Sequence, residues 1–468
     1  MSAAFDHADV QGNILRGYRQ RRVRHLVLEI ADRTAARRWL AATVSDNGDG
    51  VPQITREGRE RWTTKPDTCF NIGLTFEGLA KLGTPSISLD MFPKEFVEGM
   101  NASAIKLGDV GSSAPENWPA PFNEPKRIHL VASIYASEIA QLDRIQHQAL
   151  GDGKALKLLG ACDGWISRDN HVHFGYRDNI AQPRFAEIHG PEDHADGQPR
   201  APLGTVLLGY PTNFEGLTWR VPERVGHNGS FNAFRVLAQD VAGFEAYLTE
   251  TATYLLTHPD VDELLPPGAE ANIGEGLSRH AALREVVAAK MCGRWRSGAP
   301  LALSPDKPTH NVTANNFDYV GEDASRCPYG AHIRRSNPRG GQIVQRVANH
   351  SRRLVRRGMP YGPDYDPAHP DTKERGLLGI FLGANISAQF EAVSYDWINL
   401  GLQDPRITGS NDPLLGANDP ATSWFDLPLK SGTTIRLRGL PRFVTTRGGA
   451  YTFLPSLSAI RFLGALQN

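Results

Sequence analysis

The amino-acid sequence predicts an α+β protein built from two halves of similar plan. A strand pattern followed directly by a helix pattern opens each half, and strand and helix patterns also close each half. The two halves would join within residues 215–228. The 468 residues, of which 40% are hydrophobic, provide enough apolar material for one large core or two cores.

In the first half, residues 25–30 (HLVLEI) have the composition of a strand, and the polar-apolar period of the following ADRTAARRWLAATV predicts an amphipathic helix. The same pair recurs at residues 127–136 (RIHLVASIYA), which are followed by SEIAQLDRIQHQAL. These two strand-helix units define the expected plan of the half.

The second half begins at Gly229 with the strand pattern GSFNAFRVLAQ. Asp240 is well placed to cap the helix that follows, which would bury four side chains at helical spacing: Val241, Phe244, Tyr247 and Leu248. Near the end of the chain, RFVTTRGGAYTFLP predicts a hairpin with a Gly-Gly turn, and a terminal helix would start at Ser456.

The charge balance excludes several classes of function. With 51 basic and 51 acidic side chains the net charge is zero, which argues against a protein that binds nucleic acid or anionic membranes. No apolar run reaches the roughly 18 residues of a membrane span, and the first residues lack the apolar core of a secretory signal. We therefore expect a cytoplasmic protein.

Four cysteines stand far apart in the sequence, without a Cys-x-x-Cys pair: Cys69, Cys162, Cys292 and Cys327. This spacing argues against a zinc ribbon or a disulfide framework. Each cysteine is expected to pack as a small buried hydrophobe.

Residues 171–183 (HVHFGYRDNIAQP) are the first segment that could carry chemistry. On a strand, His171 and His173 would face the same side and could bind a metal, or they are ordinary histidines flanking a strand. Asp178 and Asn179 then have the composition of a turn, which leaves open whether the carboxylate is catalytic.

Two further segments are rich in arginine. In residues 326–339 (RCPYGAHIRRSNPR), the surrounding cations would oppose protonation of His332 and keep it neutral, as a metal ligand must be. The alternative is a basic loop in which the histidine is structural. Residues 351–363 (SRRLVRRGMPYGP) hold four arginines, which could be solvated, bind phosphate, or turn inward toward an anionic group.

The fourth segment spans residues 375–401 and predicts a buried strand, LLGIFL, followed by a helix. The core face of this helix would carry Ile386, Phe390, Val393 and Trp397. Glu391 lies beside that stripe, and by its position alone it would be a solvent-facing glutamate.

Taken together, these segments resemble the dye-decolorizing peroxidase family of haem enzymes, in its longer (class C/D-like) branch. The resemblance runs from Asp9 to Leu466 and opens with DVQGNILRGY; HFGYRDNIAQP is similar to the family's Gly-x-x-Asp-Gly segment. Further motifs follow in the family's order, among them CPYGAHIRRSNPR, LVRRGMPYGP, RGLLGIFLGANISAQFE and NDPLLG.

The resemblance implies two ferredoxin-like domains, each an antiparallel β-sheet with peripheral helices. Residues 1–220 would form the N-terminal domain, which contributes the distal aspartate segment, and residues 221–468 the C-terminal domain, which holds most of the haem b. It further implies a peroxidase that reduces hydrogen peroxide and oxidises dyes, phenols or other aromatic one-electron donors through a ferryl intermediate. A haem carrier or storage protein with incidental peroxidase activity is the alternative, and a non-haem metal at His171 and His173 is a third hypothesis.

Carried over by position, the resemblance makes His332 the proximal ligand of the haem iron. Asp178 matches the distal aspartate and Arg356 the distal arginine, with Arg353 as the competitor. Glu391 matches the acidic partner of the proximal histidine, and Asp412 is the second choice. The haem-binding residues would also include Arg334, Gln182 and Phe381.

Two departures from the family pattern stand near this site. Asn179 replaces the usual glycine, and asparagine is the next best residue at positive φ, so the turn is expected to survive. Gly379 stands where relatives commonly place a phenylalanine, so the distal pocket is either roomier or filled by Phe381. Three aromatic residues are conceivable electron relays, although core packing explains them equally well: Trp295, Tyr361 and Trp397.

Overall fold

Each half of the chain forms an antiparallel sheet with the same strand order. The computed structural model describes residues 5–45, 50–58, 60, 62–166, 169–190, 197–343 and 350–467. In the first half the order is β4-β1-β3-β2, with β1 Arg22–Ile30, β2 Thr68–Leu74, β3 Leu130–Ala136 and β4 Leu156–Trp165. The Pro- and Gly-containing sequence of residues 189–204 predicts a long loop, and residues 191–196 of it lie outside the described residues.

The second half repeats this order as β11-β5-β8-β6. Its strands are β5 Ser230–Gln239, β6 Val355–Arg356, β7 Met359–Tyr361, β8 Gly376–Gly383 and β11 Val444–Leu454. The short strands β6 and β7 both pair with β8 and together occupy the place that β2 has in the first half. The predicted pair of ferredoxin-like α+β units is thereby confirmed.

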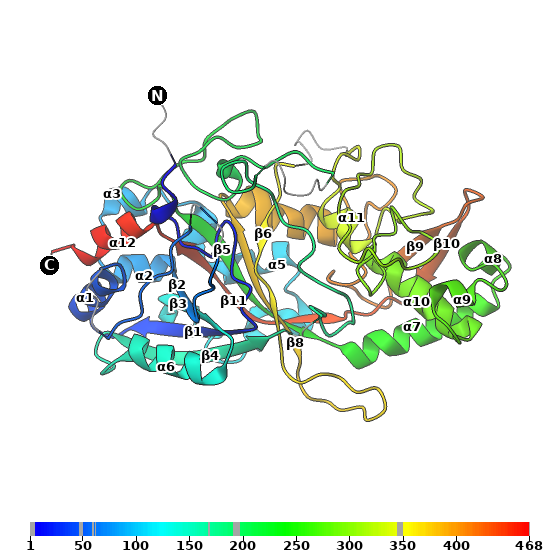
Figure 1. Cartoon of the computed structure of the whole chain (residues 1–468), viewed down its shortest axis with the longest axis horizontal. Helices are drawn as coiled ribbons and strands as arrows, with labels where there is room; N and C mark the ends of the chain where they lie inside the picture. The colour runs from blue at the N-terminus through cyan, green and yellow to red at the C-terminus, as the bar shows by residue number, and fades with distance from the viewer. Residues whose placement is uncertain are drawn as a thin grey trace.

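A helix follows the first and third strand of each half, as the strand-helix patterns predicted (Figure 1). These helices are α1 Arg33–Thr43, α6 Ile139–Leu150, α7 Val241–Leu256, and the two π-helices η7 Ile386–Glu391 and η8 Val393–Asn399. Asp240 caps α7 by accepting a hydrogen bond of 2.8 Å from the N–H of Gly243, as expected.

The remaining helices are shorter or lie outside the repeated plan. In the first half they are α2 Phe76–Lys81, α3 Ser86–Leu89, α4 Lys94–Glu98 and α5 Ala104–Leu107. In the second half they are α8 Val261–Leu264, α9 Glu270–Ile273, α10 Arg279–Cys292, α11 His332–Ser336 and α12 Leu457–Gly464, and a two-stranded sheet joins β9 Trp424–Pro428 to β10 Thr434–Arg438.

The hairpin predicted near the end of the chain is wrong: residues 444–454 form the single strand β11. The two glycines read as a turn lie inside it, at a register shift opposite β5. A Cβ atom at Gly448 would overlap the ring of Phe122, and one at Gly449 would overlap the sulfur of Met100. Close packing, and not a reversal of the chain, therefore requires glycine here. The predicted terminal helix does form, as α12, and Ser456 is its N-cap.

The two halves are continuous with each other. β2 pairs with β11 through Leu74 and Phe453, so strands β1–β8 and β11 make one nine-stranded sheet that spans both halves. Gly464 of α12 lies against Ala41 of α1, so the last helix packs on the first half. The domain boundary at residue 220 stays a prediction.

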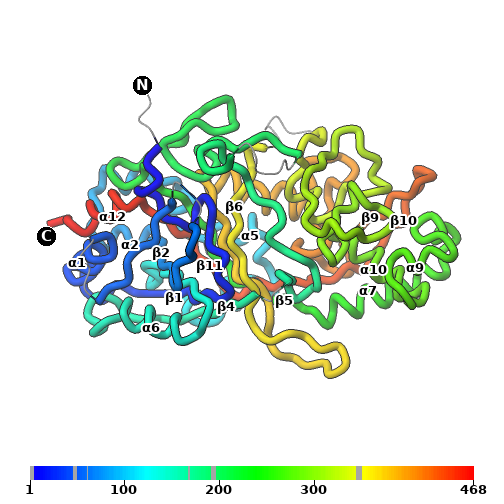
Figure 2. The backbone as a smooth tube through the Cα atoms, viewed as in Figure 1, coloured from blue at the N-terminus to red at the C-terminus, as the bar shows by residue number. Residues whose placement is uncertain are grey.

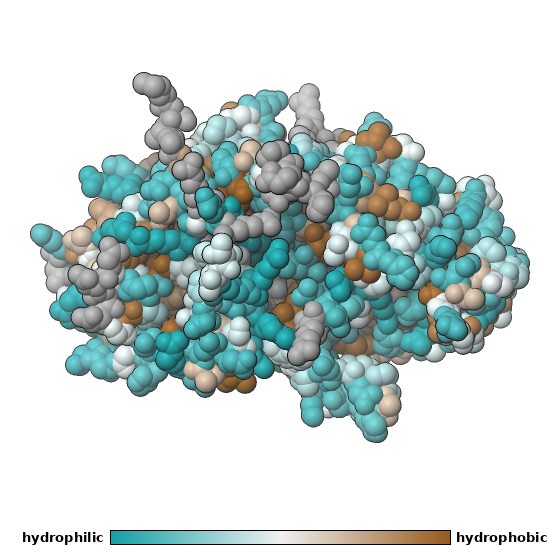
Figure 3. Space-filling view, viewed as in Figure 1, coloured by the Kyte–Doolittle hydropathy of each residue, from teal (hydrophilic) through white to brown (hydrophobic). Residues whose placement is uncertain are grey.

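The surface agrees with the composition. The face seen in Figure 3 is mostly hydrophilic, with apolar side chains in small separate groups. No helix in the described ranges combines the length and apolar character needed to cross a bilayer. All four cysteines are free thiols, three of them buried.

Candidate functional site

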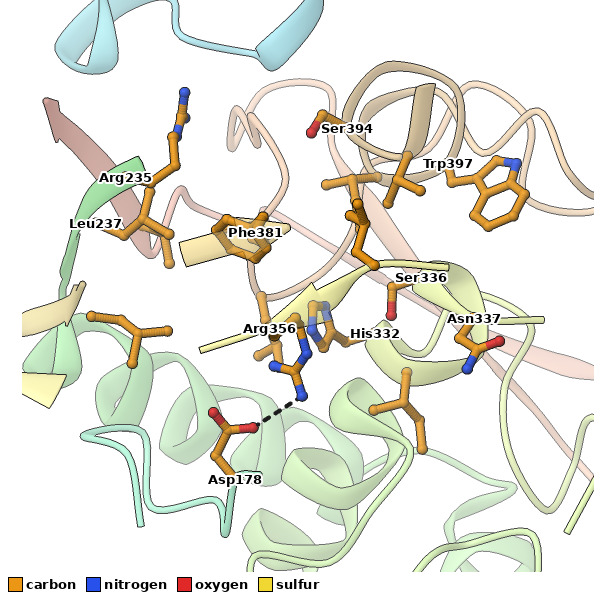
Figure 4. A pocket seen from close by; sticks show the side chains of 18 of the residues that line it. Asp178, Arg235, Leu237, His332, Ser336, Asn337, Arg356, Phe381, Ser394 and Trp397 are labelled. Carbon is orange, nitrogen blue, oxygen red and sulfur yellow. Dashed lines mark hydrogen bonds and ion pairs between the residues drawn. The ribbon is translucent and has the colours of Figure 1, made fainter. Parts of the chain in front are cut away.

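A cavity of about 350 Å³ contains side chains from both halves of the chain. Its size falls within the range of about 300–1,000 Å³ that is usual for small-molecule and cofactor sites. Asp178, His332 and Arg356, which the sequence places far apart, all line this cavity (Figure 4). Apolar walls include Leu237, Leu354, Phe381 and Leu414.

His332 is the first residue of α11, and its imidazole is held by Asp412. Nδ1 of His332 lies 2.9 Å from Oδ2 of Asp412, whose side chain has no exposed surface. The N–H groups of Leu414 and Leu415 donate to the other carboxylate oxygen at 2.9 Å each. Asp412 comes from the loop that follows η8.

Charge decides the tautomer of this histidine. Burial by itself would raise the pKa of Asp412, but the neighbouring His332 and Arg335 and the hydrogen bonds to its oxygens lower that pKa below its usual value. Asp412 is therefore an anion, and Nδ1 of His332 must be the donor. The other ring nitrogen, Nε2, has no hydrogen-bond partner among the described residues, and 29% of the side chain is exposed in the cavity.

The prediction that Glu391 is the partner of this histidine is wrong. The Glu391 carboxylate is buried elsewhere, where it accepts a hydrogen bond of 2.9 Å from the hydroxyl of Tyr451 and pairs with Lys106 at 3.3 Å. Helix η7 turns Glu391 toward β11 and away from α11. Asp412, the second choice, occupies the position beside His332.

Asp178 and Arg356 form an ion pair in the cavity. Nη2 of Arg356 donates to Oδ1 of Asp178 at 3.2 Å. Burial raises the pKa of the Asp178 carboxyl, but the positive charge of Arg356 and hydrogen bonds from Arg356 and the Asn179 N–H outweigh it, so the pKa lies below its usual value. Asp178 is therefore ionised at neutral pH.

Two neighbours shape the loop that carries Asp178. Asn179 has φ of 61°, in the left-handed region, so the expectation that asparagine preserves the turn is confirmed. The side-chain amide of Gln182 donates to the carbonyl of Arg356 at 2.9 Å and accepts from its N–H at 3.1 Å. Gln182 thereby ties the loop to β6, the strand that carries Arg356.

Phe381 lies across from Arg356 in the register of β6 and β8 and lines the cavity. A Cβ atom at Gly379 would lie only 2.5 Å from the Phe381 ring. The Phe381 ring therefore occupies the space beside Gly379. The structure supports the expectation that Phe381 fills this part of the pocket, and not the expectation of a roomier pocket.

The arginines that line the cavity differ from those that the sequence predicted. Arg334 does not line the cavity: it donates to the carbonyl of Cys327 at 2.6 Å and lies over the rings of Tyr319 and Tyr329, so its prediction as a cofactor contact is wrong. Arg339 and Arg353, both almost fully buried, line the cavity instead. Arg353 does not contact Asp178; it donates to the carbonyl of Pro199 at 2.8 Å.

The alternative metal site at His171 and His173 finds no support. No group of three potential metal ligands occurs among the residues with described positions. Nε2 of His173 lies 2.7 Å from the carbonyl oxygen of Tyr361, to which it donates, so this nitrogen is already used. The relay roles of Trp295, Tyr361 and Trp397 stay predictions.

Comparison with known proteins identifies similar chains along nearly the full length. A family model described as the DyP dimeric alpha+beta barrel domain matches residues 9–153. Dye-decolorizing peroxidase msp1 of Mycetinis scorodonius is 30% identical over 98% of this chain and 88% of its own length. Dye-decolorizing peroxidase AauDyP1 of Auricularia auricula-judae is 29% identical over 97% of this chain and 86% of its own.

Solved structures agree with the sequence relatives. The crystal structure of a fungal DyP-type peroxidase from Auricularia auricula-judae has a TM-score of 0.80 at 26% identity, covering 99% of this chain and all of that one. A dye-decolorizing peroxidase solved in complex with 2,6-dimethoxyphenol has a TM-score of 0.78 at 28% identity, covering 98% of this chain and all of that one.

Proposed function

The chain belongs to the dye-decolorizing peroxidase family, and from this premise we propose that its cavity holds the haem, with His332 as the residue that would bind the iron and the Asp178–Arg356 pair as the residues that would act on peroxide. The protein is a haem-dependent peroxidase that oxidises aromatic donors. The observation that carries the site assignment is one cavity lined by both an imidazole with a defined tautomer and a carboxylate–guanidinium pair.

The residues in the cavity fit a haem. An axial ligand needs a neutral imidazole with one nitrogen free, and a hydrogen-bond acceptor on the other nitrogen fixes its orientation and increases its basicity. In His332, Nδ1 donates to Asp412, and Nε2 is the nitrogen that would remain for the iron. Apolar side chains such as Leu237 and Leu414 provide walls for the porphyrin.

We assign the cofactor as haem b, bound without covalent links. Covalent attachment of c-type haem needs a Cys-x-x-Cys-His sequence, which this chain lacks. The positive charges of Arg339 and Arg353 at the cavity wall suit the propionate carboxylates of a haem.

When bound, haem would supply a redox-active iron and the electrons needed to cleave the O–O bond of peroxide. The ionised Asp178 would take a proton from one peroxide oxygen and return it to the other, which leaves as water. The guanidinium of Arg356 would stabilise the negative charge that develops on the departing oxygen. Asp412 would keep the His332 imidazole electron-rich by accepting the hydrogen bond from its Nδ1–H.

Phenols and dyes are the proposed donors, because a relative was solved with 2,6-dimethoxyphenol and the others carry the dye-decolorizing name. These relatives favour a peroxidase over the haem carrier considered from the sequence. The cytoplasmic location stays a prediction.

The test is the absorption spectrum of the purified protein, supplied with haemin, before and after one equivalent of hydrogen peroxide. We expect a haem spectrum that changes within milliseconds of mixing, and weakened or lost haem retention in His332→Ala. A polypeptide that stays colourless with haemin would contradict the proposal, and normal haem binding by His332→Ala would remove the axial assignment.

A further inference from the structure

Arg357 follows the proposed distal arginine directly but turns away from the cavity. Its guanidinium donates to three consecutive carbonyls near the start of the chain: Asn13 at 2.9 Å, Ile14 at 3.2 Å and Leu15 at 3.0 Å. It also donates to the carbonyl of Arg356 at 3.2 Å. Burial lowers the pKa of Arg357 to about 10, which leaves it charged at neutral pH.

The carbonyls that receive Arg357 belong to residues 9–17, which we call the N-terminal segment. Figure 2 shows the blue start of the chain passing beside the yellow part that contains β6. The side chain of Gln11 donates to the carbonyls of Ile72 and Pro455 at 2.9 Å each. The carboxylate of Asp9 accepts from Asn228 at 2.8 Å and from the N–H of Ser458 at 2.7 Å. The segment is therefore attached to both halves independently of Arg357.

Gly17 lies directly against the Arg357 side chain. Its φ is 70°, in the left-handed region, and a Cβ atom there would overlap Nε and Cδ of Arg357. The guanidinium thus packs on a residue that has no side chain to displace it. An alanine at position 17 would push Arg357 away from its carbonyl acceptors without removing any charge.

β6 needs such support because it is only two residues long, Val355–Arg356. Apart from the ladder with β8, the main chain of Arg356 is held by the Gln182 amide on both its N–H and its carbonyl, and by Arg357 on the carbonyl. The N–H of Arg357 in turn donates to Ile380 of β8 at 2.9 Å. The backbone that aims the Arg356 side chain is thus held both by Gln182, which lines the cavity, and by Arg357, which does not.

We propose that Arg357 is a positioning residue that, held by the N-terminal segment, sets the direction of the Arg356 guanidinium in the cavity. This inference rests on the proposed function, in which Arg356 acts on the distal face. It assigns a role to DVQGNILRG, the opening motif, which supplies no residue to the cavity wall.

A purely structural role for Arg357 is the competing explanation, and the chain contains a matched control. Arg37, also buried, donates to the carbonyls of Leu82 at 2.8 Å and Leu466 at 3.0 Å. A Cβ at Gly83, which has φ of 75°, would lie 2.6 Å from its Nη2. Neither Arg37 nor Gly83 lines the cavity. The pair Arg37–Gly83 therefore shares with Arg357–Gly17 a buried guanidinium, carbonyl acceptors and a glycine at positive φ, but Arg37 is not adjacent to Arg356 in the sequence.

The experiment measures fluoride binding to the ferric, haem-loaded full chain by absorption titration, together with thermal unfolding of the haem-free protein. Fluoride on the iron is an anion that a correctly aimed guanidinium stabilises. We expect Arg357→Met and Gly17→Ala to weaken fluoride binding about tenfold, the loss typical of one weakened charge-assisted hydrogen bond. Arg357→Lys should be intermediate, and Arg37→Met and Gly83→Ala should lower the melting temperature without changing fluoride affinity.

A double-mutant cycle separates the possible failures. If Arg357 acts through Arg356, adding Arg357→Met to Arg356→Met should cause no further loss of fluoride affinity. An equal loss in both backgrounds, or equal losses in the Arg37 and Gly83 controls, would overturn the inference. A loss in Arg356→Met but none in Arg357→Met and Gly17→Ala would overturn it while leaving the proposed function intact. Unchanged affinity in Arg356→Met would contradict the proposed function itself.

Discussion

Nδ1 of His332 donates a hydrogen bond of 2.9 Å to Oδ2 of Asp412, an aspartate whose side chain has no exposed surface. The N–H groups of Leu414 and Leu415 donate hydrogen bonds to the other oxygen of this carboxylate, so its orientation is fixed before any ligand binds. A negative charge at this point makes the ring a stronger electron donor through Nε2. The histidine and its aspartate therefore act as one unit.

The first prediction concerns this unit. Asp412→Asn keeps a side-chain oxygen but removes the charge, so the haem iron should have a higher reduction potential, and peroxidase activity should fall about 10- to 100-fold. Redox titration and steady-state kinetics measure the two effects. Glu391→Gln is the matched control: its carboxylate bonds Tyr451 and Lys106, so its reduction potential should equal that of the unmodified protein. A higher reduction potential in Glu391→Gln but not in Asp412→Asn would contradict the assignment of Asp412 as the partner of His332.

The second prediction concerns the proton shuttle. Asp178→Asn cannot accept a proton, so the reaction with peroxide should slow by about 10²- to 10⁴-fold, the usual contribution of acid–base catalysis. Stopped-flow mixing of the haem-loaded protein with peroxide measures this rate. The resting haem spectrum should stay nearly unchanged. A rate within twofold of the unmodified protein would remove Asp178 from the mechanism.

The third prediction follows from the lowered pKa of Asp178. A carboxyl whose pKa is depressed keeps its charge as pH falls through the usual value of about 3.9, and loses it only at lower pH. The peroxide reaction should therefore stay active below pH 4. Because Arg356 holds this pKa down, Arg356→Met should move the acid limb of the rate profile to higher pH, in addition to lowering the maximum rate. An acid limb at the same pH in both proteins would contradict the role of the ion pair.

The fourth prediction concerns Gly379 and Phe381. Gly379→Phe places a Cβ where the Phe381 ring already lies, so it should cost about 1–3 kcal/mol of unfolding free energy, as overpacking does. Adding Phe381→Gly should recover most of that loss, because one ring then replaces the other. Chemical denaturation of the two variants checks this. Additive losses in the double variant would show that the two positions do not share one space.

The fifth prediction concerns the turn at Asn179. Its φ of 61° is open to glycine and tolerable for asparagine, but it costs other residues about 1–2 kcal/mol. Asn179→Ala should therefore destabilise the protein by about that amount, whereas Asn179→Gly should change the unfolding free energy by less than about 1 kcal/mol. Thermal unfolding compares the two. Equal stability of the alanine and glycine variants would show that the turn relaxes.

Several elements could be predicted from local sequence because local forces decide them. The period of apolar residues and the cap at Asp240 were sufficient for α7, and the strand composition of residues 25–30 was sufficient for β1. The Gly-Gly pair at 448–449 misled the prediction of a hairpin because two kinds of site select glycine: a turn and a close contact. Phe122 and Met100, hundreds of residues away in sequence, determine which kind this is.

The sequence by itself determined the two-unit α+β plan, the residue types of the site and the family, because periodicity, capping and ordered motifs are written along the chain. Only the tertiary structure decided which acid holds His332, which arginines line the cavity and what the opening motif contacts. Each of those choices depends on side chains that meet across long sequence separations. Glu391 and Asp412 are 21 residues apart in the sequence, and no local pattern records which of the two carboxylates lies against His332.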